Sequence, residues 1–193
     1  MEIIIHRVNE IKFLSNIPSN YGIEIDIRSQ NSKLILNHEP HKNGDLLTNF
    51  LENYNHGTLI LNIKEAGIEK EVLKLVQRFK IQSYFLLDVE IPFLFSAMKE
   101  NIKEIAVRYS EFEPINFCTQ FNKIFDWVWI DTPYTFPLNK EIDSKLINFK
   151  KCLVCPERWN REHDIIKYKD IIYKNNFKID AVMTSFETSK YWV

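Results

Sequence analysis

Side chains able to carry out acid–base and metal chemistry concentrate in the first third of this 193-residue chain. The apolar run from Glu2 ends in His6 and Arg7, and the next run carries Glu24 and Asp26. A third run, Leu-Ile-Leu-Asn-His, ends in His38. Imidazoles transfer protons near neutral pH, and carboxylates bind hard divalent cations. These residue types together predict one polar, metal-capable site.

The spacing of Glu24 and Asp26 places both carboxylates on one face of a strand, because side chains at i and i+2 leave the backbone on the same side. Asn62 and Lys64 have the same spacing at the end of Leu-Ile-Leu-Asn-Ile-Lys. Two buried carboxylates repel each other unless a cation lies between or beside them. That cation is either an oxygen-bound divalent metal or an Arg or Lys that forms internal salt bridges.

Alternation of short apolar runs with amphipathic segments predicts the elements that position these residues. The runs expected to form strands are 2–6, 22–28, 58–64, 83–87, 104–108, 127–131, 151–155 and 180–184, with 33–37 as an extra strand paired to the second in a hairpin. The expected helices are 45–54, 68–79, 91–100, 115–121, 141–149 and 162–175.

Eight strands with helical crossovers favour an α/β fold, a compact TIM (β/α)8 barrel, over 1–193 as a single domain. An open doubly wound sheet is the competing architecture. The chain is shorter than the roughly 250 residues typical of such barrels, so one helix is expected to be missing over 7–21. In a barrel the active site lies beyond the carboxyl ends of the strands.

Composition narrows the class of protein. Lys plus Arg total 25 and Asp plus Glu total 26, so the formal charge of −1 offers no general attraction for nucleic acid. No apolar run approaches the roughly 20 residues of a membrane-spanning helix. Three cysteines and no leader-like amino terminus favour a cytoplasmic protein without disulfides. Cys152 and Cys155 have C-x-x-C spacing, but the surrounding strand pattern favours two core thiols over a redox or zinc site.

Later strand ends supply candidates for substrate binding. Glu157, which follows Cys-Pro after the seventh strand, and Arg108 are the ones we select, because strand-end loops face the ligand in barrels. Surface ion pairs are the alternative interpretation of both. The other candidates are Asp131, Arg158 and Trp129, whereas His41, His56 and His163 fall in loops or helix starts and are set aside.

These motifs resemble those of the glycerophosphodiester phosphodiesterase family, within the wider group of phospholipase C-like phosphodiesterase barrels. The family patterns are His-Arg-Gly after the first strand, Glu-x-Asp on the second, His-Asp after an apolar run, and an acid two residues before a lysine. The matching segments are His6-Arg7-Val8, Glu24-Ile25-Asp26, His38-Glu39 and Asn62-Ile63-Lys64, and the closing Asp180–Ser185 resembles the family's last strand.

The resemblance implies a metal-dependent phosphodiesterase acting on a small phosphodiester, glycerophosphodiester-like or polysaccharide-linked. Carried over residue by residue, it implies His6 and His38 as the general acid–base pair, Glu24, Asp26 and Asn62 as ligands of Mg²⁺ or Ca²⁺, and Arg7 and Lys64 as phosphate ligands. The member would be reduced and divergent: Val8 replaces a glycine, Asn62 replaces an acid, and Glu39 replaces an aspartate.

Two other functions fit the same residues. A barrel that has lost catalysis could bind a phosphorylated ligand or a protein partner, since Asn62 removes one negative charge from the metal site. Another barrel hydrolase or lyase could use the carboxylates on a substrate without phosphate.

Overall fold

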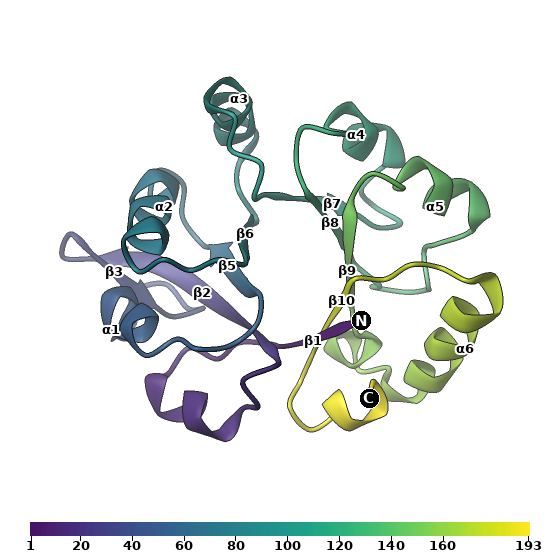
Figure 1. The fold of residues 1–193 in the computed structure, drawn as a ribbon, viewed down its shortest axis with the longest axis horizontal. Coiled ribbons are helices and arrows are strands. Elements are labelled where there is room, and N and C mark those ends of the chain that lie inside the picture. Colours follow the sequence, from purple (N-terminus) through teal and green to yellow (C-terminus); the bar gives the residue numbers. More distant parts are fainter. The chain divides into compact units, whose positions relative to one another are not determined.

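The computed structural model describes all residues 1–193 and divides them into two compact units. Unit 1 comprises Met1–Ile4 and Asn101–Val193, and unit 2 comprises Ile5–Glu100 (Figure 1). Both units combine strands with helices. The α/β class is therefore confirmed, whereas one domain over 1–193 and closure into one barrel stay predictions.

Unit 2 is built on a five-stranded sheet. Its strands are β2 (Gly22–Gln30), β3 (Lys33–Leu36), β4 (Asp45–Leu46), β5 (Leu59–Ile63) and β6 (Tyr84–Leu87). The strand β2 pairs antiparallel with β3 and parallel with β5, which in turn pairs parallel with β6. The predicted hairpin is thus confirmed. Every residue of β5 is buried, as its continuous apolar run indicates.

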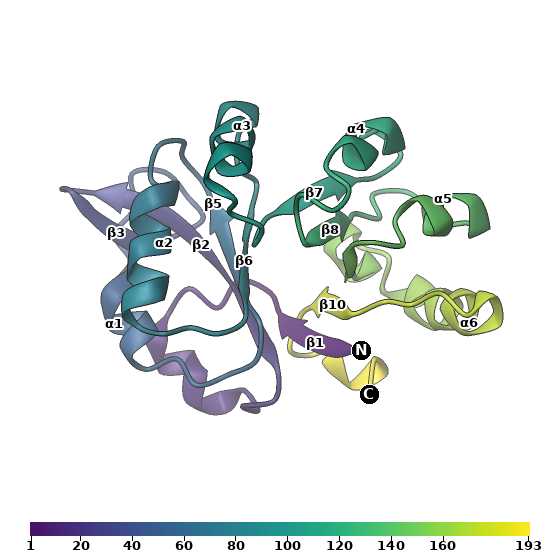
Figure 2. The same ribbon diagram turned by 45° about the horizontal axis from the view of Figure 1, so that its top comes forward.

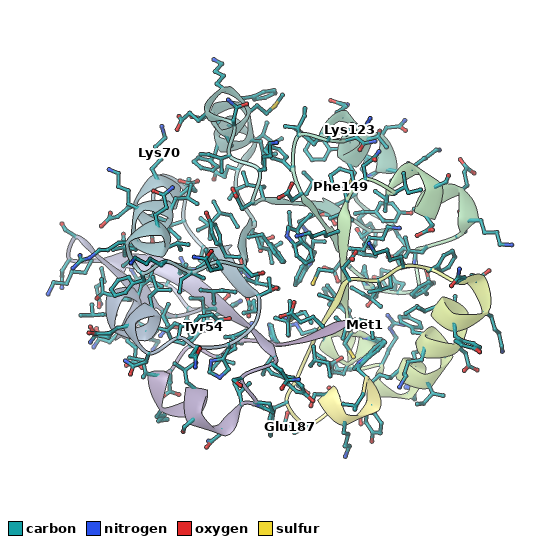
Figure 3. The ribbon with its side chains drawn as sticks, in the orientation of Figure 1. Met1, Tyr54, Lys70, Lys123, Phe149 and Glu187 are labelled. Carbon is teal, nitrogen blue, oxygen red and sulfur yellow. The ribbon has the colours of Figure 1, made fainter.

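Helices α1 (Leu47–Glu52), α2 (Glu69–Arg78) and α3 (Ile91–Glu100) belong to the same unit. The helix α2 buries Val72, Leu73 and Val76, and its Lys70 extends into solvent (Figure 3). No α-helix forms over 7–21, as predicted, and a 3₁₀-helix, Ile11–Asn16, occupies part of that segment.

Unit 1 contains strands in the order β1-β10-β9-β8-β7, and the neighbours among β7, β8, β9 and β10 pair parallel. Their bounds are β1 (Glu2–Ile5), β7 (Ala106–Tyr109), β8 (Trp127–Ile130), β9 (Lys150–Val154) and β10 (Ala181–Thr184). The registers Arg108↔Trp129 and Trp129↔Cys152 place these three side chains on one face of the sheet. All four residues of β8 and all four of β10 are buried.

The α-helices of unit 1 are α4 (Ile115–Gln120), α5 (Lys140–Lys145) and α6 (Ile165–Asn175). Short 3₁₀-helices cover Pro156–Trp159, Glu162–Asp164 and Ser189–Tyr191. The helix α4 packs on β7 and lies next to α5 (Figure 2). None of the helices has both the length and the apolar character needed to cross a membrane.

Two predicted helices are too long. The segment 141–149 forms a helix only to Lys145, since Leu146 closes the turn and Phe149 is buried just before β9 begins. The segment 45–54 loses its first two residues because Asp45 and Leu46 pair with β3. Backbone pairing with a neighbouring strand overrides helical spacing there.

Candidate functional site

The strand β2 places Glu24 and Asp26 side by side on one face, both only 1% exposed. The parallel register pairs Asp26 with Asn62 of β5, which brings the amide onto the same face as the carboxylates. Ile23, Ile25 and Ile27 alternate with the acids and are fully buried. The i and i+2 spacing therefore produces the predicted pair of adjacent buried carboxylates in unit 2.

Glu24 has three polar neighbours. Its Oε2 accepts a 2.7 Å hydrogen bond from the backbone N–H of Arg7, and Oε1 accepts a 2.9 Å bond from Nδ2 of Asn62. Nε2 of His6 lies 3.9 Å from Oε2. Burial, followed by the negative charge of Asp26, raises the pKa of Glu24 to about 7. This carboxyl group therefore exchanges a proton near neutral pH.

Asp26 lies among cationic and amide donors. Nζ of Lys64 is 3.3 Å from Oδ1, and Nε of Arg7 is 3.6 Å from Oδ2. Asn9 donates a 2.8 Å bond from Nδ2 to Oδ2 and accepts one of 2.8 Å from the Asp26 backbone N–H. Two cations thus compensate the charge of this buried carboxylate.

Asn9 and Asp88 are the site residues that our sequence analysis missed. Asp88 follows β6, and its Oδ2 lies 3.4 Å from Nζ of Lys64. Its position directly after a buried strand was the available signal, the same one that selected His6. Asn9 follows the strand by several residues in a loop, and nothing in its spacing predicts the paired contact with Asp26.

The backbone around Arg7 has an unusual conformation. Arg7 has φ of 58°, in the left-handed region that costs a side-chain-bearing residue free energy. Its own N–H donates to Glu24, and the N–H of Val8 donates 2.9 Å to the Glu24 carbonyl. These two bonds hold the turn. Val8 is buried.

His38 follows β3 and pairs with its neighbour. Its Nδ1 lies 2.7 Å from Oε1 of Glu39, and this hydrogen bond lowers the pKa of Glu39. Arg28 donates from Nε and Nη2 to the carbonyl of His38, at 3.1 and 3.0 Å, and from Nη1 to the carbonyl of Lys64, at 3.0 Å. One guanidinium therefore joins the ends of β3 and β5.

The donor set suits a hard divalent cation. Two carboxylates and an amide converge, and Oδ1 of Asn62 is buried without a hydrogen-bond partner. Oxygen donors of this kind are those that Mg²⁺ and Ca²⁺ prefer. No group of three His, Cys, Asp or Glu side chains is arranged to hold a metal ion. Glu24, Asp26 and Asn62 therefore fit such an ion with two negative charges.

The candidates from later strands lie in unit 1. Arg108 donates 2.8 Å from Nη2 to Asp131 and 2.6 Å from Nε to Glu113. Oε1 of Glu157 accepts from the Ser185 backbone N–H at 2.7 Å and from Oγ1 of Thr184 at 3.0 Å. Both side chains are part of hydrogen-bonded networks after the strands, and their substrate contacts stay predictions.

The residues set aside have structural environments. His56 contacts the carbonyls of Leu14 and Ile17 through Nε2, each at 3.2 Å. Cys152 and Cys155 are both buried, as the strand pattern predicts.

Comparison with solved structures finds proteins of similar fold. A protein assigned as a glycerophosphoryl diester phosphodiesterase from Agrobacterium tumefaciens matches with a TM-score of 0.65 and 8% identity, over 95% of this chain and 93% of that chain. A glycerophosphoryl diester phosphodiesterase from Parabacteroides distasonis matches with a TM-score of 0.62 and 13% identity, over 98% and 85%. The chain has the fold of these phosphodiesterases.

The resemblance noted in the sequence is therefore supported at the level of fold. At 8% and 13% identity, the phosphodiesterase likeness shows the fold alone. No protein-family model matches the sequence, and neither does any curated protein.

Proposed function

We propose that the chain is a metal-dependent phosphodiesterase that hydrolyses a small phosphodiester, glycerophosphodiester-like or polysaccharide-linked. The observation that carries this proposal is the cluster in which Glu24 and Asp26 lie buried beside Arg7, Lys64 and His6. The phosphodiesterase fold supports it. Buried ion clusters are costly for stability and are frequently functional.

Arg7 and Lys64 are the proposed phosphate ligands. The side chain of Arg7 is 38% exposed, so its guanidinium has donors available to an incoming anion. A phosphodiester repels nucleophiles through its anionic oxygens, and fixed cations reduce that repulsion as charge develops in the transition state.

Glu24, Asp26 and Asn62 would hold Mg²⁺ or Ca²⁺. Such an ion, when bound, supplies Lewis-acid stabilisation of the phosphoryl oxygens. The unpartnered Oδ1 of Asn62 supports this assignment, since a buried acceptor otherwise loses its hydration without compensation.

His6 and His38 are the proposed general acid and base. An imidazole accepts a proton from an attacking hydroxyl at one nitrogen, and a second imidazolium donates one to the leaving alkoxide. His6 presents Nε2 toward Glu24, and His38 presents Nδ1 toward Glu39. The hydrogen bond to Glu39 holds the orientation of the His38 imidazole. Arg108 and Glu157 are proposed to contact the remainder of the substrate.

The test is a hydrolysis assay on glycerophosphodiesters and bis(p-nitrophenyl) phosphate with added Mg²⁺, Ca²⁺ or Mn²⁺. We expect metal-dependent turnover that His6→Ala and His38→Ala each abolish. His163→Ala is the matched control, because His163 is an exposed histidine of unit 1. Full activity in either of the first two variants would exclude the assigned acid–base pair.

A second candidate function is binding without turnover. Asn62 in place of an acid and the pairing of Lys64 with Asp26 favour it, because a protein cation already compensates one carboxylate. In that case calorimetry with glycerol 3-phosphate would show metal-independent binding, and no diester would be hydrolysed.

A further inference from the structure

The parallel strands of unit 1 end in loops that each expose an aromatic ring. These rings follow β7, β8, β9 and β10 in turn, and they are Phe112 (69% exposed), Tyr134 (69%), Trp159 (44%) and Phe186 (47%). Exposed aromatic side chains are costly in water, and several at one end of a sheet indicate a binding surface.

Trp159 is held in place although its ring is exposed. Its Nε1 donates a 2.9 Å hydrogen bond to Oδ1 of Asp131. Asp131 is fixed in turn by Nη2 of Arg108 at 2.8 Å and by the Thr132 backbone N–H at 2.8 Å. A ring with a fixed edge and an open surface loses little conformational entropy when a ligand stacks on it.

The loops after β7 and β8 are also joined. Phe112 and Tyr134 form an edge-to-face pair with ring centroids 5.6 Å apart. Glu111 accepts hydrogen bonds from the backbone N–H and Oγ1 of Thr135, at 2.7 and 2.8 Å. These contacts fix a second aromatic platform.

Four buried polar atoms of the same unit lack hydrogen-bond partners, and two of them belong to Trp129 and Glu157. Nε1 of Trp129 is an unpaired donor, and this residue is only 5% exposed. Oε2 of Glu157 is an unpaired acceptor. Trp129 lies on the same sheet face as its register partner Arg108, two residues before Asp131. Each unpaired group carries a desolvation cost that a ligand or an ordered water would offset.

The positive charge of Arg108 is compensated by neighbouring carboxylates. Arg108 is paired with Glu113 and Asp131, and Glu157 adds a further carboxylate. A hydroxyl group both donates and accepts a hydrogen bond, so it can satisfy a carboxylate and an indole N–H together. A neutral polyhydroxylated ring can stack on an aromatic surface and form hydrogen bonds of this kind at its edge.

We propose that the carboxyl end of the unit 1 sheet binds a neutral carbohydrate, with the sugar ring stacked on Trp159 and its hydroxyls bonded at Glu157. The proposal goes beyond the proposed function, because it assigns a sugar ligand to the loops of unit 1 alone. Carbohydrate binding itself requires no turnover.

The experiment is saturation-transfer NMR and calorimetry on the metal-free His6→Ala variant, with methyl α-glucopyranoside, N-acetylglucosamine, ribitol and choline chloride as probes. We expect binding of at least one pyranoside. Trp159→Ala should weaken it by about tenfold, and Trp159→Phe should retain most of the affinity. Tyr173→Ala, at a ring 87% exposed on α6, should leave binding unchanged. Circular dichroism verifies that each variant is folded.

Three results would overturn the proposal. The first is that no pyranoside binds, and the second is that Trp159→Ala and Trp159→Phe bind the sugar equally well. The third is that only choline binds, which would indicate a cation site lined by aromatic rings. Because no ester is cleaved in this assay, failure of sugar binding is distinct from failure of the phosphodiesterase proposal.

Discussion

Asn62 donates a 2.9 Å hydrogen bond from Nδ2 to Oε1 of Glu24, and both side chains are buried. This bond lowers the pKa of Glu24, but burial and the neighbouring Asp26 outweigh it and leave that pKa at about 7. The amide therefore compensates the carboxylate only in part, and it leaves its own Oδ1 without a partner. Proton binding at Glu24 near neutral pH follows from this arrangement.

We predict that Glu24→Gln stabilises the metal-free protein at pH 8. The pKa of Glu24 is raised from its ordinary 4.5, so the native state binds the proton more tightly than the unfolded chain does. Its contribution to stability is present below pH 4.5 and is lost as the pH rises toward 7. Because glutamine does not titrate, the variant should have a free energy of unfolding at pH 8 that is higher by roughly 1–3 kcal/mol. The Asn62 amide can also flip, so that its Oδ1 gains a hydrogen-bond partner.

Urea unfolding of both proteins from pH 4 to pH 9 measures this effect. The free energy of unfolding of the wild type should fall between pH 4.5 and 7 relative to that of Glu24→Gln. Parallel pH profiles would show that Glu24 titrates at the same pH in the native and unfolded states.

Asn62→Asp should increase affinity for Mg²⁺ or Ca²⁺ by about tenfold or more, because a third carboxylate adds negative charge to the donor set. Without metal the same variant should melt at a lower temperature, since three buried acids repel one another. Calorimetric titration measures the metal affinity. Thermal melts without metal and with 5–10 mM metal, which is roughly 100 Kd or above at micromolar affinity, measure the change in melting temperature.

Asn139→Asp is the matched control for added charge, because Asn139 caps the exposed helix α5. It should alter neither metal affinity nor the metal dependence of melting. If Asn62→Asp gains no affinity, the metal assignment of Asn62 is wrong.

Lys64→Met should destabilise the protein by about 3–5 kcal/mol, because it leaves the buried carboxylate of Asp26 without its nearest ammonium group. Lys70→Met is the control, since Lys70 forms an exposed pair with Glu100 at 2.6 Å and such pairs contribute about 1 kcal/mol or less. Denaturant unfolding compares the two. Equal losses would mean that Lys64 acts only as a surface charge.

The sequence predicted those parts of the fold and site that depend on local periodicity. The i and i+2 spacing placed Glu24 with Asp26, and the register of β2 with β5 then aligned Asn62 with Asp26. Apolar runs located the strands to within a few residues. These features follow from burial of alternating side chains, which the sequence encodes directly.

Other features depend on contacts between segments far apart in the chain. Asn9 contacts Asp26 from a loop that also contains the left-handed residue Arg7. The three hydrogen bonds of Arg28 join two carbonyls 26 residues apart, His38 and Lys64. Such contacts leave no periodic signal, because backbone carbonyls are common to every residue.

The cysteines should be unreactive in the native protein. Burial raises the pKa of Cys118 and of Cys155 to about 12, and Cys152 is fully buried. At pH 8 we expect no reaction with a thiol reagent until guanidinium exposes all three residues. Rapid labelling of Cys152 or Cys155, or bound zinc in the purified protein, would contradict the structural role of this pair.

Arg28→Lys should lower kcat about tenfold and change KM little, if His38 and Lys64 have the proposed roles. The guanidinium fork bonds the carbonyls of both residues at once, at 3.0–3.1 Å, whereas a lysine ammonium is a single point charge. The variant keeps the positive charge, so a loss of activity would reflect geometry. A rise in KM with unchanged kcat would instead assign Arg28 to substrate binding, and unchanged kinetics would show that the alignment of His38 with Lys64 does not affect turnover.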